Sequence, residues 1–143
     1  MTQATHRSLL ADWRQLLTQW SSSGALTQAA IDALQLQREP EQLQELVARW
    51  SVGDCLDLPP IELLPAVSMP GAAGSYAFSA GTIYLNADWL QSASQEQNLA
   101  VLTEELGHHL DGLFHRSDRS GDEGALFAAL LLRGRLSGKA LCF

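Results

Sequence analysis

Side chains that can bind a metal or carry a proton are crowded into residues 99–124. That stretch, LAVLTEELGHHLDGLFHRSDRSGDEG, holds three of the four histidines and six of the sixteen acidic residues. At about 100° per residue, a helix over its first part projects four polar side chains within an arc of roughly 60° and spreads its leucines over the opposite side. The four are Glu104, His108, Asp111 and His115. Carboxylates and imidazoles on one helix face suit a metal ion.

The segment from Val101 to Asp111, VLTEELGHHLD, resembles the active-site helix of zincins, a group of zinc metallopeptidases. The zincin pattern is two apolar residues, any residue and then HExGHxLG. This sequence departs from it twice, with Glu104 in place of the first histidine and Asp111 in place of the last glycine. The resemblance implies zinc ligands at Glu104 and His108, one turn apart, and a general base at Glu105 that activates a zinc-bound water.

More acidic residues follow this helix. Some zincins take a third zinc ligand from a glutamate near the start of a later helix, so the resemblance makes Glu123 the first choice, with Asp118 and Asp122 as alternates. Asp111 is a further candidate ligand because it shares the polar helix face. The alternative is that Asp122 and Glu123 only cap the next helix, which stabilises it by about 0.3 to 1 kcal/mol each.

The carboxylate of Glu104 affects which metal is expected. Replacing a neutral imidazole adds a negative charge, reduces the Lewis acidity of zinc and makes the site more tolerant of Mn²⁺ or Ca²⁺. Without any cation, the converging acidic side chains would repel one another. We therefore expect a bound metal, zinc first. The alternative is a metal-free, hydrogen-bonded pair of Glu104 and His108, one helical turn apart.

A second resemblance covers residues 58–133. They are similar to a domain found near the start of large cyanobacterial proteins of the RTX-type calcium-binding kind, in which EE[IL]GHxxD and SDxxGDEG recur together. The resemblance bears on architecture rather than on an activity. The chain has no glycine-aspartate nonapeptide repeats, so calcium binding by such repeats is not implied. The matching residues are Glu104, Glu105, Gly107, His108, Asp111, Asp118, Gly121, Asp122, Glu123 and Gly124.

Composition excludes several classes of partner. The chain has 143 residues, 46% of them hydrophobic, and a net charge of −7. It has no basic stripe and no twenty-residue apolar span, so we expect neither nucleic-acid nor membrane binding. The N-terminus lacks the apolar run of a cleaved secretory signal, which predicts a cytoplasmic protein or export without such a signal. Two cysteines are too few for a disulfide framework, and no feature sets the oligomeric state.

The periodicities predict a single α+β domain. Residues 1–52 form a helical N-terminal part, with helices at 5–20, at 27–36 with Thr27 as the cap, and from Pro40. We expect their tryptophans in the core, and a ligand-stacking set is the alternative. Residues 53–143 form an α+β part, which the resemblance to zincins implies is zincin-like. It contains a small antiparallel sheet (61–64, 75–79 and 82–86) with a hairpin turn at residues 79–81. The active-site helix at 95–114 follows, with a capping box of Ser94 and Gln97 at its start, and a C-terminal helix at 125–132 comes after it. Gly107 inside a helix costs about 1 kcal/mol relative to alanine, which indicates a close neighbour such as a strand.

The strand that begins at Gly81 and ends at Asn86, GTIYLN, resembles the zincin strand that lies before the active-site helix. The resemblance implies that this strand is the sheet edge on which an extended peptide or protein substrate docks by main-chain pairing. Two functions follow from the sequence. One is a zinc-dependent hydrolase, a metallopeptidase with Glu105 as base. The other is a non-catalytic module derived from a zincin, metal-stabilised or metal-free, that binds a partner.

Overall fold

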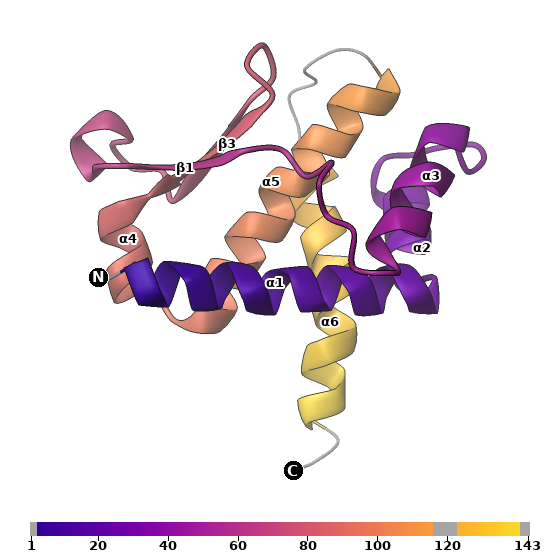
Figure 1. Ribbon diagram of the computed structural model, residues 1–143, viewed down its shortest axis with the longest axis horizontal. Coiled ribbons are helices and arrows are strands. Elements are labelled where there is room, and N and C mark those ends of the chain that lie inside the picture. Colours follow the sequence, from indigo (N-terminus) through magenta and orange to yellow (C-terminus); the bar gives the residue numbers. More distant parts are fainter. Residues whose placement is uncertain (1–2, 116–122, 141–143) are drawn as a thin grey trace.

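The computed structural model describes the backbone of residues 3–115 and 123–140, and the side chains of residues 7–115 and 123–133. Within these ranges the chain forms an α+β fold of six α-helices and one three-stranded sheet, in agreement with the predicted class. The sheet lies to one side of the molecule and helices α2 and α3 to the other, with α5 and α6 between them (Figure 1). No helix in the described ranges is both long and apolar enough to span a membrane.

Three helices form the N-terminal part, as predicted: α1 (Gln3–Ser23), α2 (Ala25–Ala33) and α3 (Glu41–Trp50). Helix α2 begins before the predicted cap at Thr27, because Gly24 adopts a φ of 86° and turns the chain directly after α1. A positive φ of this size costs glycine little and other residues more. The side chains of Trp13 and Trp50 are completely buried. The prediction that these tryptophans are core residues is confirmed.

A buried hydrogen-bond chain joins the first helix to the helix of the motif. The indole Nε1 of Trp13 donates to Thr103 Oγ1 at 3.2 Å, and that hydroxyl donates to the carbonyl of Leu99 at 2.7 Å. Both polar groups are therefore satisfied inside the core, which removes the cost of burying them. One cluster of buried side chains includes residues of α1, α2, α3, β3, α5 and α6.

The sheet consists of β1 (Ile61–Leu64), β2 (Gly74–Ala77) and β3 (Thr82–Asn86) in the order β1-β3-β2. Strand β2 is antiparallel to β3, but β1 is parallel to it, so the prediction of a purely antiparallel sheet is wrong. The predicted turn at residues 79–81 is confirmed: Ala77 O accepts from Gly81 N at 2.7 Å, and Gly81 has a φ of 62°. This short hairpin fixes β2 against β3. The chain reverses direction between β1 and β2 and again between β2 and β3. Strand β1 therefore runs in the same direction as β3 and pairs with its other side in parallel.

Strand β3 is central, because both of its sides are paired. The prediction that the strand from Gly81 to Asn86 is a sheet edge is therefore wrong. Apolar and polar residues alternate along this strand, which predicts that one of its faces is buried. The alternation does not predict whether one or two other strands pair with it. In the described part of the chain the edge strands are β1 and β2.

Two further helices follow the sheet before the last one. Helix α4 (Ala87–Ser92), which the sequence analysis did not predict, begins where the Oδ1 atom of Asn86 accepts hydrogen bonds from the backbone N–H groups of Asp88 and Trp89, both at 3.0 Å. The Asn86 side chain also donates through Nδ2 to Ala72 O at 3.0 Å. Helices α5 (Gln95–His115) and α6 (Glu123–Ala140) follow, and α5 matches its predicted bounds to within one residue.

Asn86→Ala should lower the free energy of unfolding by about 2 kcal/mol, because it removes a helix cap and leaves the Ala72 carbonyl without this donor. Chemical denaturation followed by circular dichroism measures the change. Ser92→Ala is the matched control, since its exposed hydroxyl makes one bond, to Trp89 O, at the other end of the same helix. The control should change stability by less than about 0.5 kcal/mol. Equal effects of the two substitutions would contradict the role given to Asn86.

Candidate metal centre

The motif lies on a helix whose start is fixed by a reciprocal cap. The backbone N–H of Gln97 donates to Ser94 Oγ at 3.1 Å, and the N–H of Ser94 donates to Gln97 Oε1 at 2.8 Å. This is the predicted capping box, and it satisfies two N–H groups that a helix start leaves without internal partners. The cap fixes the first turn of α5. The helical period then sets the direction in which each motif side chain projects.

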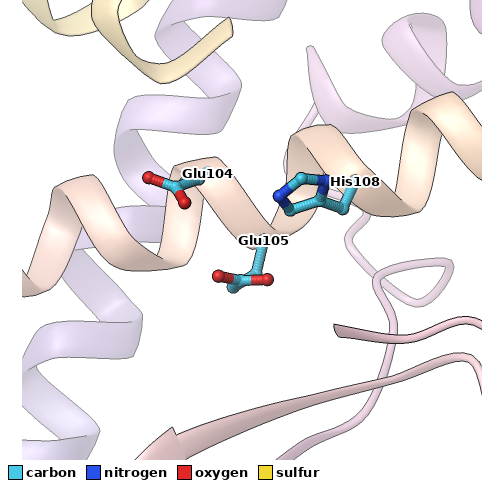
Figure 2. Close-up of side chains that lie close together, drawn as sticks. All are labelled: Glu104, Glu105 and His108. Carbon is cyan, nitrogen blue, oxygen red and sulfur yellow. The ribbon is translucent and has the colours of Figure 1, made fainter. Parts of the chain in front are cut away.

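Glu104, Glu105 and His108 come together on α5. One ligand atom from each of the three lies within 4.8 Å of the other two. Figure 2 shows the imidazole of His108 turned toward the two carboxylates from the next turn of the helix. Glu104 and His108 are partly exposed, whereas Glu105 is buried, with 6% of its surface accessible. The structure thus brings together the three residues that carry the zincin resemblance.

Burial raises the pKa of Glu105 from 4.5 to about 7, and the nearby charge of Glu104 adds to the increase. Low polarizability around a carboxylate penalises its charged form, and a second negative charge penalises it further. A cation bound between the two carboxylates would relieve both penalties. Two carboxylates and an imidazole are also a donor set that Zn²⁺ and Mn²⁺ accept. The residues present therefore fit a divalent metal.

Strand β2 crosses directly over Glu105. A Cβ placed on Gly74 would lie 2.5 Å from Val101 Cγ1 and 3.3 Å from Glu105 Cγ, with Glu105 Oε2 at 3.5 Å. Only glycine allows the strand backbone to come this close to the helix. Glu105 is therefore covered by the backbone of β2, which accounts for its burial on a helix face that also carries the partly exposed Glu104 and His108.

On its other side, α5 is crossed by the start of α6 at two glycines. A Cβ on Gly107 would lie 2.9 Å from Gly124 Cα, and a Cβ on Gly124 would lie 2.5 Å from Glu104 O and 2.8 Å from His108 Nε2. The close neighbour expected at Gly107 is thus a helix rather than a strand. Because the His108 ring lies against the backbone of Gly124, the α6 crossing restricts the orientation of one of the two predicted ligands.

Asp111 lies outside the group of three. Its carboxylate is buried and lies 3.5 Å from His115 Nε2, one turn further along α5. The same nitrogen donates to the carbonyl of Leu34 at 2.9 Å, which connects the end of α5 to the end of α2. A carbonyl only accepts, so the proton of His115 lies on Nε2. Both residues therefore have structural contacts away from Glu104 and His108.

The predicted third ligands fall at the start of α6 and before it. Glu123 is the first residue of α6, next to the Gly124 that contacts the His108 ring, and its Oε2 atom is buried. It does not join the group of three at the 4.8 Å spacing. Asp118 and Asp122 lie outside the described residues.

His109, which has no role in the predicted site, points toward the sheet. Its Nδ1 lies 2.8 Å from the hydroxyl of Tyr76 on β2, and the two rings meet edge to face with centroids 5.3 Å apart. Burial lowers the pKa of His109 from 6.5 to about 4, so the ring is neutral at neutral pH. The helical spacing alone places His109 about 100° round the helix from His108, but it does not identify Tyr76 as the partner of His109.

No protein-family model, curated protein or solved structure matches this chain. The comparisons add no residue roles to those that the geometry supplies.

In the metal-free chain, the stabilisation from protonated Glu105 should be complete below pH 4.5 and be lost as the pH rises through about 7. Above pH 7 the loss amounts to about 3 kcal/mol, because each unit of pKa shift corresponds to about 1.4 kcal/mol. Over the same range, the free energy of unfolding of wild type should fall by this amount relative to Glu105→Gln, which cannot ionise. Urea denaturation of both proteins from pH 4 to pH 9 measures the difference.

His109 contributes with the opposite sign, since its lowered pKa makes stability fall as the pH drops from 6.5 to about 4. Both proteins retain His109, so this contribution cancels in the comparison. Glu104→Gln should shift the upper end of the Glu105 transition to lower pH, because it removes the charge of the neighbouring carboxylate. A difference between wild type and Glu105→Gln that does not change with pH would contradict the assignment.

Proposed function

We propose that this chain is a zincin-like metallopeptidase domain that binds zinc through Glu104 and His108 and uses Glu105 as its general base. The observation that carries the proposal is the convergence of the three ligand atoms within 4.8 Å on one side of α5. A Glu–His pair one helical turn apart can hold one ion from a single helix, as the resemblance to zincins implies.

The environment of Glu105 supports its role as the base. Bound zinc supplies Lewis acidity, which lowers the pKa of water and polarises a carbonyl. Glu105 lies beside both proposed ligands, so its carboxylate can accept a proton from an attacking water and release it to the leaving amine. The β2 backbone over Gly74 covers this carboxylate, keeps bulk water away and holds the side chain in one direction.

Glu123 is the first candidate for a third ligand. Its neighbour Gly124 lies against the His108 ring, so the start of α6 already borders the site. Asp118 and Asp122 remain alternates, and Mn²⁺ and Ca²⁺ remain alternatives to zinc because the donor set includes carboxylates.

The peptide substrate expected at β3 is better accommodated at β2. Strand β2 is an edge strand, and its Gly74 lies on Glu105. Asn86 N donates to Ala73 O, so by alternation along the ladder the main-chain groups of Gly74 are directed away from β3. An extended peptide added to this edge would place a carbonyl near Glu105 by main-chain pairing.

The second candidate function is a non-catalytic module that retains a metal or has lost it. The presence of a glutamate, Glu104, in the first ligand position favours this non-catalytic module. A carboxylate in the first ligand position adds negative charge to the metal and weakens its Lewis acidity, so binding can persist while hydrolysis is lost. Both functions predict the same fold, and hydrolysis of a peptide distinguishes them.

His108→Ala should abolish stoichiometric zinc uptake by the purified protein, because it removes the neutral nitrogen ligand. His109→Ala is the matched control. It lies about 100° further round the helix and faces Tyr76 instead of the group of three, so uptake should stay near the wild-type value. Equilibrium dialysis with elemental analysis gives the metal content. Equal losses from both substitutions would show that the wrong face of α5 has been chosen.

Glu105→Gln should retain zinc and reduce peptide hydrolysis by about 100-fold or more, because an amide does not accept a proton from water. Glu104→His restores the usual zincin ligand pair, and it should increase both zinc affinity and cleavage of an unstructured protein substrate. Mass spectrometry of a peptide library measures the cleavage. A Glu104→His protein that is fully loaded with zinc and cleaves no peptide would favour the non-catalytic module.

A further inference from the structure

An open cavity of about 590 Å³ lies between the β2–β3 hairpin and the C-terminal half of α5. Its volume is within the range of small-molecule sites in proteins, about 300 to 1,000 Å³. Helix α3 contributes Gln42 at its rim. The wall consists mainly of aromatic and aliphatic groups from Tyr76, Phe78, Gly81, His109, Gly112 and Leu113.

Three rings line this cavity, and two of them are held in fixed positions. Tyr76 and His109 meet edge to face at 71°, and a hydrogen bond of 2.8 Å joins them. Phe78 lies on the backbone of α5, because a Cβ on Gly112 would come within 2.7 Å of Phe78 Cε1. The Phe78 side chain is nevertheless 40% exposed. Exposure of a large apolar ring to water is unfavourable. A ligand ring that stacks on Phe78 would remove this cost.

The polar groups of the cavity are few and directional. A phenol O–H is more acidic than a neutral imidazole N–H, so we assign the Tyr76 hydroxyl as the donor to His109 Nδ1. The proton of His109 then lies on Nε2, which makes no hydrogen bond to any residue in the described ranges. Among the residues that the structure describes, no carboxylate, ammonium or guanidinium group lines the cavity. A ligand that matches these residues is uncharged, and it offers an acceptor to the imidazole N–H.

We propose that this cavity binds a neutral aromatic ring with a hydrogen-bond acceptor. The ring stacks on Phe78 and Tyr76, and its acceptor takes the His109 Nε2–H. A free phenolic compound and the side chain of a tyrosine in a peptide share this chemistry. The site needs no metal, so the inference stands apart from the proposed hydrolysis.

Titration of the metal-free chain with p-cresol, followed by amide chemical shifts, tests the proposal. A dissociation constant on the order of 1 mM is expected for a ligand of this size. The shifts should change at Tyr76, His109 and Leu113. Toluene, which lacks the acceptor, should bind about fivefold more weakly, the effect of one neutral hydrogen bond. Equal affinity for toluene, or no binding of p-cresol at 10-fold this concentration, would overturn the proposal.

Two exposed alanines provide a matched pair of variants. Ala80 lines the cavity on the hairpin, and Ala80→Trp should weaken p-cresol binding at least tenfold by filling the space. Ala129 lies on α6 away from the cavity, and Ala129→Trp should leave binding unchanged. Equal effects of the two would overturn the location. Titration with N-acetyl-Ala-Tyr-Ala-amide then separates the sources: tighter binding than p-cresol, with shifts that extend along β2, identifies a peptide side chain, and equal or weaker binding identifies a free phenol.

Discussion

The crossing of α5 and α6 at Gly107 and Gly124 is the contact on which the rest of the arrangement depends. Two helices normally pack with their axes 8–10 Å apart, separated by side chains. Here a Cβ on Gly124 would fall 2.5 Å from the carbonyl oxygen of Glu104, so backbone meets backbone. Helix α6 also packs on α2, and through this crossing the N-terminal helices and the motif helix share one core. A larger residue at either glycine would separate the helices and release the His108 ring.

Glycine has a similar role on the opposite side of α5. Gly74 brings the β2 backbone onto Glu105, and Gly112 brings Phe78 onto the helix two turns later. The candidate metal centre is thus bounded by backbone on two sides. Backbone has few alternative positions, so Glu105 and His108 are oriented more strictly than residues held only by flexible side chains. The buried carboxylate with a raised pKa is the energetic cost of this enclosure, and a bound cation would reduce that cost.

Much of this could be predicted from the sequence, and the exceptions share a physical cause. Local signals succeeded: the Ser94–Gln97 cap, the turn at Gly81, the apolar spacing of α1 and the Glu104–His108 pair all act within a few residues. Such local signals do not predict which strands pair or which side chains meet across long stretches of sequence. The period-2 pattern of β3 fits an edge strand as well as a central one, and the parallel neighbour β1 is set by the path of the chain. The partner of His109 lies 33 residues away, which no local spacing reveals.

The Trp13–Thr103 hydrogen bond spans 90 residues of sequence. On the ribosome, the apolar stripe of α1 is therefore complete long before the helix that covers it exists. At about 5–20 residues per second, the interval is about 5 to 20 seconds. During that time Leu9, Trp13 and Leu17, which are almost fully buried in the finished fold, can pack against α2 and α3 but lack the contacts of α1 with α5. The final burial of the first helix thus follows the synthesis of the motif helix, and a nascent chain that is halted before Thr103 leaves this stripe without its contacts to α5.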